Sequence, residues 1–177
     1  MAIGPIHKNF DVDLLNVATY QAVSGTGKDA VEELNTQLED SNAEAKVYPK
    51  KIAFNVIPQC DIFLDNDFTK EEMKVTWETK KILDPNISLS ATCVRVPVFV
   101  GHSESVNIEF NSEVNAKKIR ECLEKAPGCK VVDETKDGGY ITPTEATDDF
   151  LTYISRIRED QTQKNCINMW VVSDNLL

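Results

Sequence analysis

Strict alternation of apolar and polar residues marks one strand near the middle of the chain. Residues 105–110 carry apolar side chains at the even positions and mostly polar ones between them, which is the pattern of a strand with one buried face. Residues 87–100, rich in β-branched types, precede this segment, and Gly101 lies between the two. We therefore predict two strands that pair as neighbours.

Shorter signals predict the remaining elements. Further strands are expected at residues 14–21, 130–132, 153–159 and 166–172. Helices are expected from residue 30, from a capping box that begins at Thr69, from Ser112 to about Glu124, and briefly after Thr142. The polar stretch 36–51 is interpreted as a surface connection and residues 52–58 as a buried apolar segment. This mixture predicts an α+β fold, with a mixed or antiparallel sheet and helices packed on one side.

Composition narrows the class of protein. A chain of 177 residues with 41% hydrophobic and 27% charged residues is typical of one folded domain, here 1–177. A net charge of −10 argues against a nucleic-acid partner. No apolar run approaches the roughly 20 residues of a membrane span, so we predict a cytoplasmic protein without a membrane partner. Five scattered cysteines without a Cys-x-x-Cys pair, and only two histidines, predict neither a disulfide framework nor a metal site.

Arg95 and His102 are the first candidates for chemistry. Arginine can bind a carboxylate or phosphate through two parallel hydrogen bonds, and histidine exchanges protons near neutral pH. Seven residues apart on an unbroken strand, their side chains would point to opposite faces. Pro97 and Gly101 lie between them and allow a bend that brings both into one pocket. Alone, such a pair is more often structural than functional.

Four ordered motifs carry a family resemblance. Cys93-Val-Arg-Val-Pro-Val followed by Gly-His-Ser-Glu-Ser105 resembles the active-site segment of aspartate-semialdehyde dehydrogenases. Residues 16–28, 52–58 and 170–176 resemble that family in the same order, so the resemblance runs from about residue 6 to the end. It implies the fold of the C-terminal domain of glyceraldehyde-3-phosphate dehydrogenase-like proteins.

The resemblance also implies site roles. His102 would be the general acid/base, and Arg95 would bind the substrate's α-carboxylate. Gln21 would contact substrate, while Glu71 would bind the substrate's amino group and Lys74 its phosphoryl oxygens. From the residues alone, Glu71 and Lys74 are equally a surface ion pair on one helical face.

A second pair leaves the substrate assignment open. Glu78 and Lys81 have the same three-residue spacing as Glu71 and Lys74. The sequence cannot decide between the two pairs, although the pattern before the Arg/His segment favours the first.

The glycine-rich stretch at 24–28 is a candidate for cofactor contact. It lacks the spacing of a P-loop and the third glycine of a dinucleotide fingerprint, and a simple strand-to-helix turn explains it equally well. The resemblance implies that NADP is contacted here by Ser24, Gly25 and Gly27, and by Asn175 near the end of the chain, but is bound mainly by another domain.

The implied reaction is the NADPH-dependent reductive dephosphorylation of L-aspartyl-4-phosphate to aspartate semialdehyde and phosphate, in lysine, threonine and methionine biosynthesis. The family's nucleophilic cysteine stands in an Asn-Cys-x-Thr segment that none of the five cysteines matches. We therefore expect a fragment: one catalytic and dimerisation domain of a homodimer, without the N-terminal NADP-binding domain and the C-terminal helix, and inactive alone.

Two alternatives remain at this stage. N-acetyl-glutamyl-phosphate reductase carries out parallel chemistry on another acyl phosphate. A non-catalytic dimerisation module would keep the fold and lose the reaction, although it would have no chemical reason to retain Gln21, Arg95 and His102.

Overall fold

The computed structural model describes all 177 residues and is built on one six-stranded sheet, with the strand order β2-β1-β3-β6-β5-β4. The strands are β1 (Val12–Gln21), β2 (Ser88–Arg95), β3 (His102–Phe110), β4 (Cys129–Val131), β5 (Thr152–Glu159) and β6 (Cys166–Ser173). β1 runs parallel to β2 and β4 parallel to β5, while the other neighbours are antiparallel. The predicted mixed sheet is confirmed.

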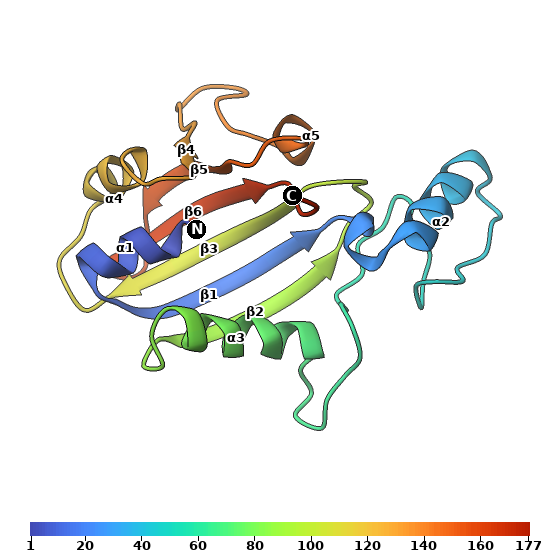
Figure 1. The fold of residues 1–177 in the computed structure, drawn as a ribbon, viewed down its shortest axis with the longest axis horizontal. Helices are drawn as coiled ribbons and strands as arrows, with labels where there is room; N and C mark the ends of the chain where they lie inside the picture. The colour runs from blue at the N-terminus through green and yellow to red at the C-terminus, as the bar shows by residue number, and fades with distance from the viewer.

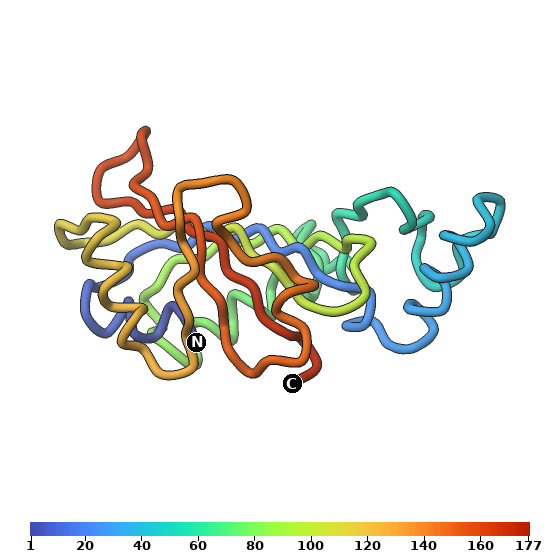
Figure 2. The backbone as a smooth tube through the Cα atoms, turned by 90° about the horizontal axis from the view of Figure 1, so that it is seen from above, coloured from blue at the N-terminus to red at the C-terminus, as the bar shows by residue number.

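The helices are α1 (Ile3–Phe10), α2 (Lys28–Glu39), α3 (Lys70–Ile82), α4 (Ala116–Glu124) and α5 (Pro143–Ala146), with a 3₁₀ turn η1 (Val23–Thr26). The short α5 packs with Tyr153 and Val172 of the sheet, apart from the main core. α1, α3 and α4 lie on the same side of the strands (Figures 1 and 2). The main core forms there, where Ile6 of α1 and Ile119 of α4 pack with Leu15, Ile108 and Ile167 of the sheet. The predicted one-sided packing is confirmed, although the sequence did not predict α1.

The capping box at the start of α3 also fixes this helix to the sheet. Thr69 accepts a hydrogen bond from the Glu72 amide, and Glu72 Oε2 accepts one from the Thr69 amide at 2.7 Å. The other oxygen of the same carboxylate accepts the backbone N–H of Cys93 at 3.0 Å. Since β2 is an edge strand, this side chain satisfies a donor that no neighbouring strand could reach.

α2 and the loop after it form a lobe that projects from the sheet, at the right of Figures 1 and 2. Its small core contains Val23, Ala30, Leu34, Tyr48, Ile52 and Ile57. The carboxylate of Glu33 accepts the backbone N–H groups of Lys46 and Val47 at 2.5 and 2.6 Å, which holds the loop against α2.

The lobe corrects two predictions. Residues 36–51 are not simply a surface connection, because α2 continues to Glu39 and Tyr48 is buried. Residues 52–58 are only partly buried: Phe54 is 87% exposed and Val56 is 58% exposed. An apolar composition alone did not reveal that this segment follows the edge of the lobe.

The predicted pairing of the strands at residues 87–100 and 105–110 is wrong. β2 and β3 are not neighbours, because β1 lies between them, parallel to one and antiparallel to the other. Closeness in sequence favours hairpins, but here β1 is recruited from a distant part of the chain. The helix predicted from Ser112 instead begins at Ala116, where Asn115 Oδ1 accepts the Lys118 amide at 2.9 Å. No helix combines the length and the apolar character needed to cross a membrane.

Candidate active site

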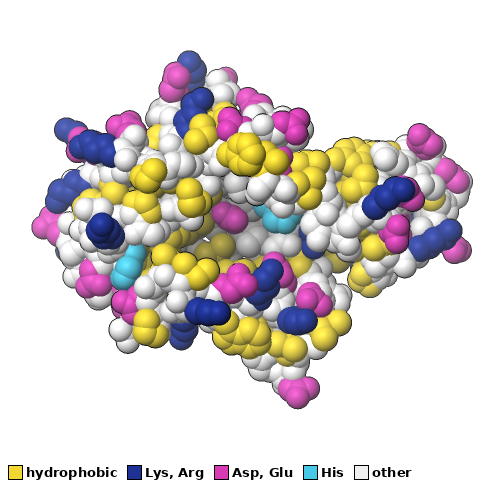
Figure 3. All heavy atoms as spheres, viewed as in Figure 1, with side chains coloured by type: hydrophobic (Ala, Val, Ile, Leu, Met, Phe, Trp, Pro, Cys, Tyr) yellow, Lys and Arg dark blue, Asp and Glu magenta, His cyan; other side chains and the backbone are white.

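The candidate residues meet where the parallel strands β1 and β2 end and β3 begins. Gln21 and Arg95 are the last register partners of the β1–β2 ladder, and His102 is the first residue of β3. The chain reverses between β2 and β3, and Gly101 has a φ of 94° that favours glycine. The predicted bend therefore exists. It brings the side chains of Arg95 and His102 to the same place, beside Gly25, although the residues are seven apart in sequence. Figure 3 shows a hollow above the strands, between α3 and the helices opposite it.

The backbone of Ala22 holds both central side chains. Its N–H donates to Nδ1 of His102 at 3.2 Å, and its carbonyl accepts from Nη1 of Arg95 at 2.6 Å. Arg95 is only 7% exposed, and its Nε has no hydrogen-bond partner within the chain. A buried guanidinium with unused donors is suited to binding an anionic group with two oxygens.

His102 is neutral near neutral pH. Burial lowers its pKa to about 4, and the positive charge of Arg95 contributes in the same direction. The carboxylates of Glu71 and Asp174 and the carbonyl of Gly101 oppose this shift. Of these two side chains, Arg95 is therefore positively charged and the imidazole of His102 is uncharged.

Gln21, Glu71 and Lys74 form one chain of contacts beside Arg95. Nε2 of Gln21 donates to Glu71 Oε1 at 3.4 Å, and Glu71 Oε2 lies 3.6 Å from Nζ of Lys74. Glu78 and Lys81 are both exposed and have no comparable contact with Gln21. The geometry thus favours the first of the two pairs that the sequence left open.

The loop after β1 closes the other side of the site. Ser24 and Asn175 share two hydrogen bonds of 3.0 and 3.2 Å, and Asn175 Oδ1 also accepts the Gly101 amide at 2.8 Å. A Cβ on Gly25 would lie 3.1 Å from Nη1 of Arg95 and 3.2 Å from Nε2 of His102. Gly27 is different: it precedes α2 with a φ of 116°, and a Cβ there would meet nothing within 4 Å.

Cys60 and Cys93 are not activated thiols. Burial raises the pKa of Cys60 to about 11 and that of Cys93 to about 12, whereas a catalytic thiol needs a lowered pKa. No group of three or more His, Cys, Asp or Glu side chains is placed to hold a metal ion.

Sequence reasoning missed two residues of this region. Ala22 acts through its backbone, so no side-chain pattern could have revealed it. Glu104 lies two residues beyond His102 on β3, and burial raises the pKa of its carboxyl group to about 6. Its place in the Gly-His-Ser-Glu-Ser motif was the available signal.

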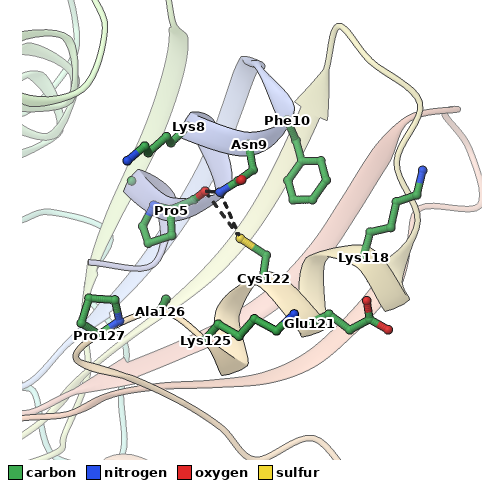
Figure 4. Close-up of a pocket in the computed structure, with 11 residues that line it drawn as sticks. Pro5, Lys8, Asn9, Phe10, Lys118, Glu121, Cys122, Lys125, Ala126 and Pro127 are labelled. Carbon is green, nitrogen blue, oxygen red and sulfur yellow. Dashed lines mark hydrogen bonds between the residues drawn. The ribbon is translucent and has the colours of Figure 1, made fainter.

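Another cavity, of about 630 Å³, lies between α1 and α4 (Figure 4). Asn9 donates to Cys122 Sγ at 3.7 Å, and that thiol donates to the Pro5 carbonyl at 3.5 Å. Burial raises the pKa of Cys122. None of the candidate residues lines this cavity, and its thiol is occupied by local contacts.

The sequence family described as "Semialdehyde dehydrogenase, dimerisation domain" matches residues 3–177. The chain belongs to this family. Aspartate-semialdehyde dehydrogenase of Shewanella violacea is 46% identical over 99% of this chain, and the enzyme of Campylobacter jejuni is 42% identical over 97% of it. The chain spans about half the length of these relatives, 53% and 52%.

Solved structures agree with this assignment of the semialdehyde dehydrogenase dimerisation domain. Aspartate semialdehyde dehydrogenase II of Vibrio cholerae, solved in complex with ASA, has a TM-score of 0.93 and 40% identity over 98% of this chain and 53% of its own. The Francisella tularensis enzyme has a TM-score of 0.87 and 26% identity, over 98% of this chain and 56% of its own. The expected family and fold are confirmed.

Proposed function

We propose that this chain is the catalytic and dimerisation part of an NADP-dependent aspartate-semialdehyde dehydrogenase. The reaction is the reductive dephosphorylation of L-aspartyl-4-phosphate to aspartate semialdehyde and phosphate. The supporting observation is the buried Arg95 guanidinium, fixed beside the neutral imidazole of His102 by the one residue Ala22. Relatives that are 46% and 42% identical bear the name of this enzyme.

Each role is the one that the family resemblance implies, and the position of each side chain supports it. Arg95 would bind the α-carboxylate with its Nε and remaining Nη donors, since Nη1 is already engaged by Ala22. Glu71 would bind the α-amino group, and Gln21, its hydrogen-bond partner, would contact the substrate. Lys74, with a half-exposed side chain, would reach a phosphoryl oxygen. His102 would be the catalytic residue at the reacting acyl group.

The residues around Gly25 fit contact with the nicotinamide end of NADP. The absent side chain at Gly25 leaves backbone accessible directly beside Arg95 and His102, and Ser24 and Asn175 hold each other there. Bound NADPH would supply the hydride. The nucleophilic thiol and the rest of the cofactor site would come from a region that corresponds to the unmatched half of the relatives. Within this proposal the enzyme is cytoplasmic.

The face of the sheet opposite α1, α3 and α4 supports a homodimer. Polar side chains of β1, β2 and β3 are exposed there, namely Asn16, Thr92 and Ser105, and the rings of Tyr20 and Trp170 lie 5.5 Å apart on the same face. A second copy related by twofold symmetry would cover this surface, in keeping with the description of the matched family.

A chimera tests the activity directly. These 177 residues would replace the matched part of the Shewanella violacea enzyme, and NADPH formation would be measured with aspartate semialdehyde and phosphate. We expect turnover in the chimera, loss of turnover in its His102→Asn variant without loss of dimerisation, and none in the 177-residue chain alone. Preference for N-acetylglutamate semialdehyde, or no turnover in a chimera that folds and dimerises, would contradict the proposal.

A further inference from the structure

The glycine loop, residues 24–27, is held by side-chain hydrogen bonds at two points. At the first point, Ser24 and Asn175 share the two hydrogen bonds described above. At the second, the hydroxyl groups of Thr26 and Tyr48 lie 2.8 Å apart and form a hydrogen bond. The second contact joins the loop to the lobe formed by α2 and the chain that follows it.

Tyr48 has a fixed place in the lobe. Its side chain is 8% exposed and packs in the small core of the lobe, and its backbone N–H donates to Glu33 of α2 at 3.4 Å. Burial raises the pKa of Tyr48, although the hydrogen bond to Thr26 and the positive charge of Arg95 oppose this shift. The phenol therefore keeps its proton near neutral pH. Because a phenol is more acidic than an aliphatic alcohol, we assign the bond as donation from Tyr48 to Thr26 Oγ1.

The lobe is also attached to the strand end that carries the buried guanidinium. Ile57 and Arg95 exchange two backbone hydrogen bonds, of 2.9 and 2.8 Å, and Ile57 belongs to the same small core as Tyr48. One packed unit therefore touches both the glycine loop and the end of β2. The contact at Tyr48 sets where the loop lies relative to that strand end.

The glycine loop needs such support because little else restricts it. α2 begins at Lys28 without a side chain that caps its N-terminus, and Gly27 before it has a φ of 116° and open space where a Cβ would be. Gly25 places bare backbone beside Arg95 and His102, since a Cβ there would lie 3.1 Å from atoms of both. A segment with two glycines keeps such a position only if other groups restrict its backbone.

We propose that Tyr48 is a positioning residue for the cofactor: its hydroxyl group holds Thr26, and with it the glycine loop, in the conformation that accepts the nicotinamide end of NADPH. This inference rests on the proposed function and adds to it a residue from outside the loop. Tyr48 acts through Thr26 and is not itself a contact of the cofactor. Arg95 and His102 are held by the backbone of Ala22, so the substrate side of the site keeps its geometry when this bond is removed.

Binding of NADPH to the chimera, followed by the change in its fluorescence, tests the inference without requiring turnover. Tyr48→Phe keeps the ring in the core of the lobe and removes only the hydroxyl group, so we expect the Kd for NADPH to rise about threefold to tenfold, the range for one hydrogen bond. Thr26→Val should have the same effect, and Thr26→Ser should bind NADPH like the unsubstituted chimera. Because both changes remove one bond, the double variant Tyr48→Phe/Thr26→Val should be no weaker than either single variant.

Matched controls remove hydroxyl groups elsewhere. Tyr140→Phe changes an exposed tyrosine before α5, and Thr36→Val changes an exposed threonine whose hydroxyl group donates to the Glu32 carbonyl within α2. Both should leave the Kd for NADPH unchanged. In steady-state kinetics, Tyr48→Phe should raise the KM for NADP by the same factor as the Kd and leave kcat and the KM for aspartate semialdehyde unchanged.

The contrary outcomes are distinct. An unchanged Kd in Tyr48→Phe, even with a lower melting temperature, would show that the contact only stabilises the lobe and would overturn the proposal. Additive effects in the double variant, or a rise confined to the KM for aspartate semialdehyde, would overturn it as well. A chimera that binds NADPH but does not turn over aspartate semialdehyde would contradict the proposed function, while the Kd values would still decide the role of Tyr48.

Discussion

The amide of Gln21, at the end of β1, donates to the carboxylate of Glu71 on α3 at 3.4 Å. This contact ties the central strand to the helix beside the edge strand and leaves the second carboxylate oxygen directed at Lys74. A carboxylate held in this way is oriented before a ligand arrives, which reduces the entropy lost on binding. Glu78, on an exposed part of the same helix, has no such support.

Substitution should separate these two carboxylates. In the active chimera, Glu71→Gln is expected to raise the KM for aspartate semialdehyde about tenfold to a hundredfold, because hydrogen bonds to charged groups contribute roughly 1.5–3 kcal/mol. Glu78→Gln should leave KM and kcat unchanged. Steady-state kinetics of both variants check this, and the reverse order of effects would move the substrate pair to Glu78 and Lys81.

A side chain at Gly25 should crowd Arg95 and His102. In Gly25→Ala, the new methyl group would lie 3.1 Å from Arg95 Nη1 and 3.2 Å from His102 Nε2, so turnover of the chimera should fall at least about tenfold, with about 1 kcal/mol lost from the free energy of unfolding. Gly4→Ala is the matched control, since its methyl group would meet only Leu83 at 3.7 Å and neither glycine has a positive φ. Equal kinetics in the two variants would remove Gly25 from the site.

Two partly buried groups, His102 and Glu104, should give opposing dependences of stability on pH. The pKa of His102 falls from 6.5 to about 4 on folding, so its contribution to stability is complete above pH 6.5 and is lost as pH falls towards 4. The pKa of Glu104 rises from 4.5 to about 6, so its contribution is complete below pH 4.5 and is lost as pH rises through 6. As upper bounds, the shift of His102 corresponds to roughly 3.5 kcal/mol and that of Glu104 to roughly 2 kcal/mol.

Urea unfolding between these pH values separates the two effects. Glu104→Gln should leave only the histidine effect, with the free energy of unfolding rising with pH from 4 to 6.5. His102→Gln should leave the opposite slope between pH 4.5 and 6. Identical pH profiles in the two variants would show that these groups are not the ones that titrate.

The open face of the sheet should be sensitive to a new charge. Ser105 is exposed on β3, on the face opposite α1, α3 and α4. Ser105→Arg is expected to convert a dimer to a monomer by placing like charges opposite each other across a twofold axis. Glu124→Arg on α4 should leave the dimer intact. Sedimentation equilibrium measures both, and a dimeric Ser105→Arg variant would place the interface elsewhere.

Glu72 should matter for stability more than its position on a charged helix suggests. Glu72→Ala removes the acceptor of the Thr69 and Cys93 amides, and we expect a loss of about 2–3 kcal/mol in the free energy of unfolding. Glu78→Ala, on the exposed side of α3, is expected to change it by less than about 0.5 kcal/mol. Chemical unfolding of both variants provides the measurement.

Sequence patterns predicted those helices and strands whose signal lies within the element itself. The capping box at Thr69 and the alternation over residues 105–110 both correspond to observed elements. The pairing of strands could not be read in this way, because the register of Gln21 with Arg95 joins segments far apart in the chain. α1 was missed because Gly4 and Pro5 usually indicate a turn, although proline is tolerated in the first turn of a helix.

The candidate site also contains residues that the sequence could predict and residues that only the fold shows. Motif resemblance predicted Arg95 and His102, whose side chains both contact the backbone of Ala22, and Asn175, which contacts Ser24. It could not identify Ala22, because an amide and a carbonyl are present at every position and only the fold decides which ones face a functional group. The preference for Glu71 over Glu78 likewise depends on the fold, because only Glu71 lies on the turn of α3 that contacts Gln21.

The parallel pairing of β1 with β2 has a consequence for folding kinetics. Parallel neighbours require a long crossover, and here residues 22–87, including the lobe and α3, must be placed before the β1–β2 ladder can close. β5 and β6 are consecutive antiparallel strands and pay a much smaller loop-closure entropy. We therefore expect the β5–β6 hairpin to form early and the pairing of Gln21 with Arg95 to form late. The candidate active site would then be the last part of the molecule to assemble.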